Sequence, residues 1–170
     1  MSLARGFPPI ARPGARILIL GSMPGRESLA RQQYYAHPRN AFWPIVNDLL
    51  QIEASDYRQR TRQLAARGVA LWDVLKACFR IGSLDSAIDE NRIVSNDFDA
   101  FFAEHPRIGH LFFNGAKAEA LYVKHVRPKL PTQWAVLPAT RLPSTSPAHA
   151  SMSRADKTAA WRAILQTGLQ

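Results

Sequence analysis

Short aliphatic segments alternate with segments of helical spacing, and this alternation restricts the fold more than any other feature of the sequence. Four segments have the pattern of buried strands, at residues 16–21, 69–73, 108–114 and 133–137. Five segments place apolar residues at helical spacing, at residues 41–51, 56–67, 95–104, 116–126 and 153–166. Strands that alternate with helices form βαβ crossovers. We therefore predict an α/β protein, a three-layer α/β/α sandwich around a four-stranded, mainly parallel sheet.

Several helix ends are marked by capping residues. Gly68 is placed to end the second helix, and Ser95 is placed to cap the third. Ser153 and Asp156 have the spacing of a capping box at the start of the last helix. Because no repeat or linker divides the sequence, we expect a single domain that spans residues 1–170.

Positive charge is concentrated at the two ends of the chain. The sequence has 22 Lys and Arg against 13 Asp and Glu, a net charge of +9 and a pI near 10.4. Residues 1–40 carry +5 and residues 117–170 carry +6, whereas residues 41–116 carry −2. Clustered positive charge suits a polyanion, nucleic acid before membrane. The alternative is a small protein that is basic without such a partner.

Composition argues against several classes of protein. The longest apolar runs are too short to cross a bilayer, and Arg5 and two prolines interrupt the first nine residues. We therefore expect neither a membrane partner nor a secretion leader. Cys78 is the only cysteine, which rules out an intrachain disulfide and a multi-thiolate zinc site. We predict a cytoplasmic protein that uses no metal and no cofactor.

Functional groups of parallel sheets gather at the carboxyl ends of the strands. This rule selects the loop after Gly21, the region after Asp73, the pair Asn114–Gly115 and the loop after Leu137. The first loop (residues 21–25) is Gly-Ser-Met-Pro-Gly, in which glycines allow the backbone to approach an anion. It lacks the Gly-Lys-Ser/Thr ending of a Walker A loop. A tight structural turn is the alternative.

The last loop, residues 137–151, alternates hydroxyl side chains with prolines. Such a segment presents N–H and O–H donors from a rigid backbone, and Arg141 adds a positive charge. These features suit phosphate binding. An ordinary surface connection rich in Ser and Pro is the alternative.

Together, the motifs resemble those of the uracil-DNA glycosylase superfamily. The resemblance rests on GSMPG, YAHPRNAFW and LPSTSP, in this order along the chain. YAHPRNAFW is similar to the mismatch-specific uracil/thymine branch. Taken with GVALWDVL, GSLDSAI, NDFDAFF, FFNGAKA and LPSTSPAHASMS, the set most resembles the hypoxanthine-DNA (deoxyinosine) glycosylase branch. The resemblance extends over about residues 16–161.

The resemblance implies a catalytic role for the loop after the first strand, where the superfamily holds the side chain that orients water or stabilises the sugar cation. Met23 stands where many branches have Asp or Asn, and a thioether does not take over that role. The hypoxanthine branch uses an asparagine later in the loop, which matches Asn40. We predict that the Asn40 amide oxygen positions the water, and Ser22 is the second catalytic candidate. Asn40 is also placed to cap the next helix, and it could do both.

The resemblance also implies a set of base-binding residues. Tyr35 matches the aromatic residue that stacks on the flipped base. Asp73 matches the position that binds the polar edge of the base, where a carboxylate could accept from N1–H of hypoxanthine or N3–H of uracil. Backbone donors of Gly21 and Met23 and the side chain of Asn114 complete this set. The residues alone also allow Asp73 to cap the next segment and Asn114 to end its strand.

A third set is expected to bind the phosphates around the flipped nucleotide. It consists of Pro24, Gly25, Arg141, Ser144, Thr145, Ser146 and His149. A solvated loop histidine is the alternative for His149 and for His37, and Trp43, Trp72 and Trp161 are expected in the core.

The resemblance thus predicts a monofunctional DNA glycosylase of base excision repair that removes a deaminated base, hypoxanthine first and uracil second. Its partner is DNA that contains deaminated bases, bound by a monomer. Lys117 is expected on a helix beyond the third strand, so we predict no Schiff base. Three alternatives stay open: a non-catalytic module that binds damaged DNA, a mismatch-specific uracil/thymine glycosylase, and a phosphate-handling enzyme for free nucleotides.

Overall fold

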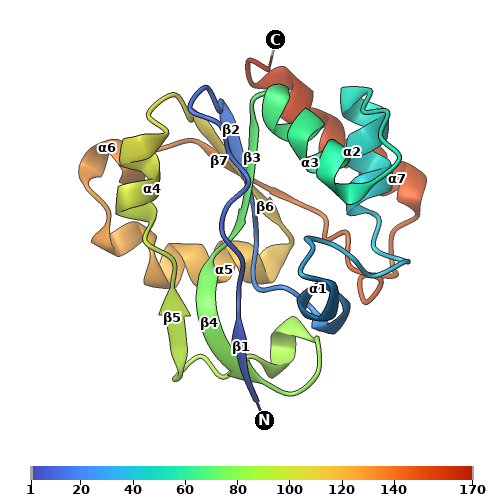
Figure 1. The fold of residues 1–170 in the computed structure, drawn as a ribbon. Helices are drawn as coiled ribbons and strands as arrows, with labels where there is room; N and C mark the ends of the chain where they lie inside the picture. The colour runs from blue at the N-terminus through green and yellow to red at the C-terminus, as the bar shows by residue number, and fades with distance from the viewer. Residues whose placement is uncertain (1, 170) are drawn as a thin grey trace.

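The computed structural model describes residues 2–169, and a parallel four-stranded sheet lies at its centre (Figure 1). Met1 and Gln170, the ends of the predicted domain, lie outside the described residues. The strand order is β3-β2-β6-β7, and every neighbouring pair is parallel. The strands are β2 (Ile17–Gly21), β3 (Val69–Asp73), β6 (His110–Asn114) and β7 (Ala139–Leu142). Because β2 and β3 are buried on both faces, their sequences are almost continuously apolar.

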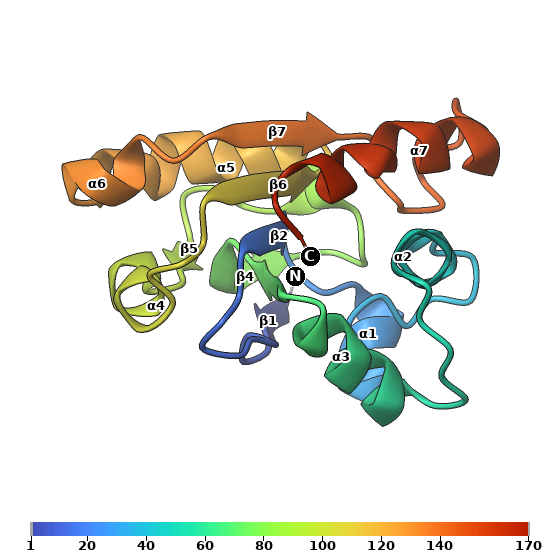
Figure 2. The ribbon, with the colours of Figure 1, turned by 90° about the horizontal axis from the view of Figure 1, so that it is seen from above.

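Helices cover both faces of this sheet, so the predicted α/β/α sandwich is confirmed. Figures 1 and 2 show α1, α2, α3 and α7 on one side and α4, α5 and α6 on the other. The helices are α1 (Arg26–Arg31), α2 (Phe42–Leu50), α3 (Tyr57–Ala66), α4 (Phe98–Glu104), α5 (Ala116–His125), α6 (Thr132–Ala135) and α7 (Arg154–Trp161). Short 3-10 helices lie at Asp85–Ala87 (η1), Arg127–Lys129 (η2) and Arg162–Gln166 (η3). None of the helices described is long and apolar enough to cross a membrane.

The order of the strands creates a topological switch point between β2 and β6. From β2 the chain crosses to β3 on one side, and after β3 it returns to β6 on the other side of β2. The connections therefore leave the carboxyl ends of these strands in opposite directions and open a crevice there. This is the place where the functional groups of such a sheet are expected.

A second, antiparallel sheet was not predicted. Its strands are β1 (Ser2–Arg5), β4 (Leu75–Arg80) and β5 (Ile93–Ser95), in the order β1-β4-β5. Only Val74 separates β4 from β3, so the chain passes directly from the large sheet into the small one (Figure 1). The connection after β4 carries η1 toward the carboxyl end of β2.

The fourth predicted strand, residues 133–137, is wrong. Residues Thr132–Ala135 form α6, and the strand is β7, at Ala139–Leu142. The apolar signal of 133–137 comes partly from Trp134, which stacks on Phe102 with ring centroids 5.6 Å apart. Leu142 is the only buried residue of β7, because this strand lies at the sheet edge. Its pattern was therefore too weak to be recognised.

The predicted helix ends are partly confirmed. Ser153 caps α7 by accepting from Asp156 N at 3.1 Å, but the α-helix ends at Trp161 and continues as η3. Ser95 is not the cap of α4, because it ends β5; the cap is Asp97, which accepts from Ala100 N at 3.1 Å. The three tryptophans expected in the core, Trp43, Trp72 and Trp161, are all buried there.

Candidate active site

A cavity of about 400 Å³ opens at the carboxyl ends of β2, β3 and β6. This volume lies in the range that is typical of small-molecule sites. Six parts of the chain line it: residues 21–28, residues 34, 35, 37 and 40, Asp73, residues 83–86, residues 114–117 and residues 144–149. The loops that the sequence selected therefore meet at one cavity, as predicted.

The first loop is shaped by the close approach of two side chains to Gly21. A Cβ atom at Gly21 would lie 2.5 Å from Asp73 Oδ1 and 2.9 Å from the Tyr35 hydroxyl oxygen. Any larger residue would therefore push both groups away. Beneath the loop, the buried Arg80 guanidinium donates a hydrogen bond to the carbonyl of Pro24. The first loop is thus fixed by Asp73 and Tyr35 at Gly21 and by Arg80 at Pro24.

Tyr35 lines the cavity with its ring packed on the start of α2. The ring stacks on Phe42, with centroids 4.1 Å apart and planes inclined by 24°. Its backbone is left-handed, with φ of 55°, a conformation that few residues other than glycine adopt. Burial, followed by the charge of Asp73, raises the pKa of the Tyr35 hydroxyl. Tyr35 is therefore a neutral phenol on a rigid aromatic support.

Asn40 lines the cavity two residues before α2 begins. Its Oδ1 accepts from Phe42 N at 2.9 Å, but the N-cap position is Ala41, so the predicted capping role is wrong in position. An amide oxygen has two lone pairs, so this contact leaves one for a water molecule. His37 lies nearby, and its Nδ1 accepts from Arg39 N at 3.1 Å. Both residues are therefore fixed by local backbone contacts.

Asp73 ends β3 with its carboxyl group enclosed in the protein. The residue is 4% exposed, and its Oδ2 has no hydrogen-bond partner among the described residues. Burial and the negative charge of Asp85 raise the pKa of Asp73 to about 7, although the Arg80 charge opposes this rise. An enclosed carboxyl group without a partner at a cavity wall is typical of a binding site.

Asn114 ends β6 and holds the last loop in place. Its Nδ2 donates to Thr145 Oγ1 at 2.9 Å, and its Oδ1 accepts from Thr145 N at 2.9 Å. The carbonyl of Thr145 accepts from Ala41 N at 3.0 Å, and Thr145 is 1% exposed. Asn114, predicted to bind the base, is therefore hydrogen-bonded to Thr145, predicted to bind phosphate.

The Ser/Pro loop (residues 143–149) is anchored further by α7. Trp161 Nε1 donates to Pro143 O at 2.9 Å, and the buried Lys157 donates to His149 O at 2.7 Å. Ser144 and Ser146 lie between these anchors, and each hydroxyl accepts from a backbone N–H two residues further on. The loop is therefore a preorganised wall of the cavity.

Arg141 is the one predicted site residue that lies outside the cavity. It is exposed on β7 and pairs with Glu119 of α5, with 3.5 Å between Nη1 and Oε1. Strand alternation decides this position, because Leu142 beside it is the residue that turns inward. The other predicted site residues, His149 included, all line the cavity.

Comparison with known proteins places this site in a family. A model of the family described as "Uracil DNA glycosylase superfamily" matches residues 8–166. The chain belongs to the uracil DNA glycosylase superfamily. The resemblance inferred from the sequence motifs is therefore confirmed.

Two relatives within the superfamily are named hypoxanthine DNA glycosylase. The protein from Methanosarcina acetivorans is 40% identical over 118 residues, which cover 68% of this chain and 73% of that protein. The protein from Methanosarcina barkeri is 36% identical over 116 residues, with 67% and 72% covered. A solution NMR structure of a candidate uracil DNA glycosylase from M. acetivorans covers 96% of this chain and 99% of its own, with a TM-score of 0.76 and 33% identity.

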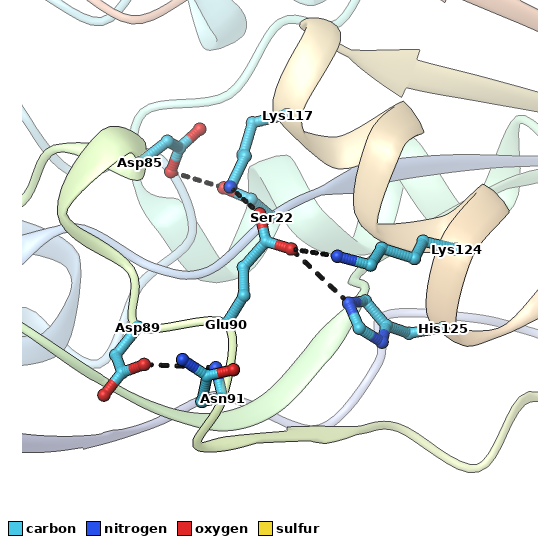
Figure 3. Close-up of polar contacts among 8 residues, drawn as sticks. All are labelled: Ser22, Asp85, Asp89, Glu90, Asn91, Lys117, Lys124 and His125. Carbon is cyan, nitrogen blue, oxygen red and sulfur yellow. Dashed lines mark hydrogen bonds and ion pairs between the residues drawn. The ribbon is translucent and has the colours of Figure 1, made fainter.

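Asp85 and Lys117 are charged residues of the cavity for which no role in the site was predicted from the sequence. Asp85 of η1 accepts from Ser22 Oγ at 2.6 Å (Figure 3), and Lys117 of α5 also lines the cavity. Asp85 stands in GSLDSAI, a motif that carried the superfamily resemblance but received no role. The unpredicted small sheet brings it to the first loop. Its position could not be read from the spacing along the sequence.

Lys117 is held by an ion pair. Its ammonium group pairs with Glu90, which also pairs with Lys124 and lies 3.6 Å from His125 Nε2 of α5 (Figure 3). Hydrogen bonds from Lys117 and Lys124 lower the pKa of Glu90 to about 2. This cluster fastens the connection between β4 and β5 to α5. Among residues 2–169, no group of three or more His, Cys, Asp or Glu side chains is arranged to hold a metal ion.

Proposed function

We propose that this protein is a monofunctional DNA glycosylase that removes hypoxanthine, and secondarily uracil, from DNA. One observation carries the proposal: Tyr35, Asn40, Asp73 and residues 144–146 line a single cavity in a chain of the uracil DNA glycosylase superfamily. The names of its two Methanosarcina relatives support hypoxanthine as the first substrate.

In the proposed mechanism, the deaminated nucleotide is turned out of the duplex and its base enters the cavity. Flipping costs a few kcal/mol, and least for a mispaired base, which adds selectivity. Tyr35 stacks on the base, while Asp73 and the backbone donors of Gly21 and Met23 bind its edge. Asn114 supports this pocket through Thr145.

The N-glycosidic bond then breaks with both electrons leaving on the base, and a sugar cation remains. Water held by Asn40 Oδ1, with Ser22 as the alternative, adds to the anomeric carbon and loses a proton, which gives the abasic product. Backbone N–H groups of the first loop stabilise the charge that develops on the departing base.

The DNA backbone is proposed to bind along the cavity rim. Gly25, Ser144, Ser146 and His149 line the cavity and are partly exposed, whereas Pro24 is buried and shapes the first loop. Thr145 contributes by fixing this loop, and Arg141 by general charge. The excess positive charge of the chain supports DNA as the partner. We further propose that one copy of the chain acts alone, in the cytoplasm.

The test uses a duplex with a single deoxyinosine, followed by hot alkali to reveal abasic sites. We expect cleavage by the wild type, strongly reduced cleavage by Asn40→Ala, and unchanged cleavage by Asn47→Ala, a matched asparagine of α2 that is absent from the cavity lining. Tight binding without an abasic product would instead show a non-catalytic module. Duplexes with uracil or mispaired thymine, and free nucleotides, test the other two alternatives.

A further inference from the structure

The carboxyl group of Asp85 lines the same cavity as that of Asp73. Asp73 Oδ1 lies 2.5 Å from the Cβ position of Gly21, and Asp85 Oδ1 lies 2.6 Å from the hydroxyl oxygen of Ser22, the next residue. Consecutive residues of the first loop therefore contact the two carboxyl groups, and both groups line the cavity. Asp73 has no ion-pair partner among the described residues, and its Oδ2 has no hydrogen bond there.

Several charged or titratable groups face this pair from the surrounding elements. Arg80 of β4 is 2% exposed, and its charge acts on both carboxyl groups, but its described hydrogen bond goes to Pro24 O. Lys117 of α5 acts on Asp85 from the other side, and it is already paired with Glu90. Four further groups near the pair are uncharged around neutral pH because burial raises their pKa values: the hydroxyls of Tyr34, Tyr35 and Tyr57 and the thiol of Cys78. The remaining titratable residues of the cavity lining are Arg26, Glu27, His37 and His149.

The two carboxyl groups have different surroundings. Burial raises the pKa of Asp85 as well, but the Ser22 hydrogen bond and the charges of Arg80 and Lys117 oppose this rise and favour its charged form. Asp73 is enclosed, and its Oδ2 accepts no hydrogen bond from residues 2–169, which favours its neutral form. The negative charge of Asp85 acts on Asp73 within the same cavity, so the two groups do not both ionise readily and one proton is expected to stay on Asp73.

We propose that Asp73 binds hypoxanthine as a neutral carboxylic acid and that Asp85, held by Ser22, is the positioning residue that keeps the proton on it. This inference rests on the proposed glycosylase function. The carbonyl oxygen of Asp73 accepts from N1–H of the base, and its O–H donates to O6. A carboxylic acid thereby satisfies the N1–H and O6 edge with two hydrogen bonds, whereas a carboxylate offers only acceptors and would repel O6.

The same hydrogen bond assists departure of the base. As the C1′–N9 bond breaks and its electron pair moves onto the purine, negative charge spreads to O6, and the Asp73 O–H group stabilises it. Proton transfer to O6 would leave Asp73 as a carboxylate. The water that adds to C1′ then releases one proton, which restores the acid. Atoms and charge balance without a further reactant.

The experiment measures single-turnover release of hypoxanthine from about pH 5.5 to about pH 8. We expect the wild-type rate to be level at low pH and to fall about tenfold by one pH unit above the pKa of Asp73. Asp73→Asn presents the same acceptor and donor but has no acidic proton to transfer, so it should keep a reduced rate that shows no such fall with pH. Asp85→Asn should move the fall to lower pH, because a like charge is removed. The control Asp48→Asn, exposed on α2, should behave as the wild type.

A wild-type rate that rises with pH through neutrality, together with an inactive Asp73→Asn, would overturn the inference and make Asp73 a carboxylate acceptor. The proposed function would survive that result, since it fails only if no abasic product forms at any pH. Titration of the ¹³C-labelled carboxyl groups by NMR in the free protein needs no activity. A neutral Asp73 signal at pH 6 in the wild type, with a lower midpoint in Asp85→Asn, supports the inference; an ionised one refutes it.

Discussion

Replacing Asp73 by asparagine is predicted to stabilise the folded protein, and to do so increasingly as the pH rises. In the folded protein, burial and the Asp85 charge raise the pKa of Asp73 from 3.8 to about 7. Between these values the unfolded chain releases a proton that the folded protein keeps. The contribution of Asp73 to stability is therefore largest below pH 4 and is lost as the pH rises toward 7.

The size of this change in stability follows from the difference between the pKa values of Asp73 in the folded and unfolded protein. Each pH unit between the two pKa values changes the free energy of unfolding by about 1.4 kcal/mol, so the whole interval is worth about 4 kcal/mol. An asparagine amide has nearly the same shape and does not ionise. Asp73→Asn should therefore match the wild type near pH 4 and be more stable by about 4 kcal/mol at pH 8.

Urea unfolding, followed by tryptophan fluorescence, measures this difference at each pH. Carboxyl groups that do not interact with Asp73, such as the salt-bridged Glu90, titrate alike in both proteins, so their contributions cancel in the comparison. A difference between the two proteins that does not change with pH would refute the reasoning. So would a variant that is less stable than the wild type at pH 8, because Asp73 would then be an ionised partner of Arg80.

Three further predictions concern the architecture of the cavity and its charge. Gly21→Ala places a Cβ atom against Asp73 and Tyr35. We expect the free energy of unfolding in urea to fall by about 1–3 kcal/mol and hypoxanthine release to be lost. A variant that is as stable and as active as the wild type would contradict this. Asn114→Ala leaves the backbone N–H and the hydroxyl of Thr145 buried without their partner. We expect the free energy of unfolding to fall by about 2–4 kcal/mol and hydrogen exchange at Thr145 N–H to become faster. Unchanged exchange would show that the loop does not depend on this contact. Binding to DNA should weaken linearly with the logarithm of salt concentration in a filter-binding or anisotropy assay, and a flat dependence would argue against phosphate contacts.

The large sheet was predictable because its central strands are buried on both faces. β2 and β3 are apolar at nearly every position, and their ends coincide with glycine or aspartate. Signals from partly exposed strands were weaker. β7 buries only Leu142, and two residues of β5 are half-buried, so neither strand has a clear alternation of apolar and polar residues. These strands are defined by pairing with distant segments, which one sequence does not reveal.

The location of the site was also predictable, but not the roles within it. The rule that functional groups gather at the carboxyl ends of parallel strands selected Gly21, Asp73 and Asn114, and all three line the cavity. The contact between Asn114 and Thr145 joins residues 31 positions apart and was not foreseen. Asp85 was also missed because its partner is distant in the sequence: it lies in η1, after β4 of the small sheet, and contacts Ser22, 63 positions away.

The most direct test is a crystal structure of Asn40→Ala bound to a duplex that contains deoxyinosine. We predict that the hypoxanthine base lies outside the helix, stacked on Tyr35, with its N1–H and O6 edge toward Asp73 and with adjacent phosphates at the Ser/Pro loop. A hypoxanthine that stays stacked in the duplex while DNA occupies another face of the protein would contradict the account.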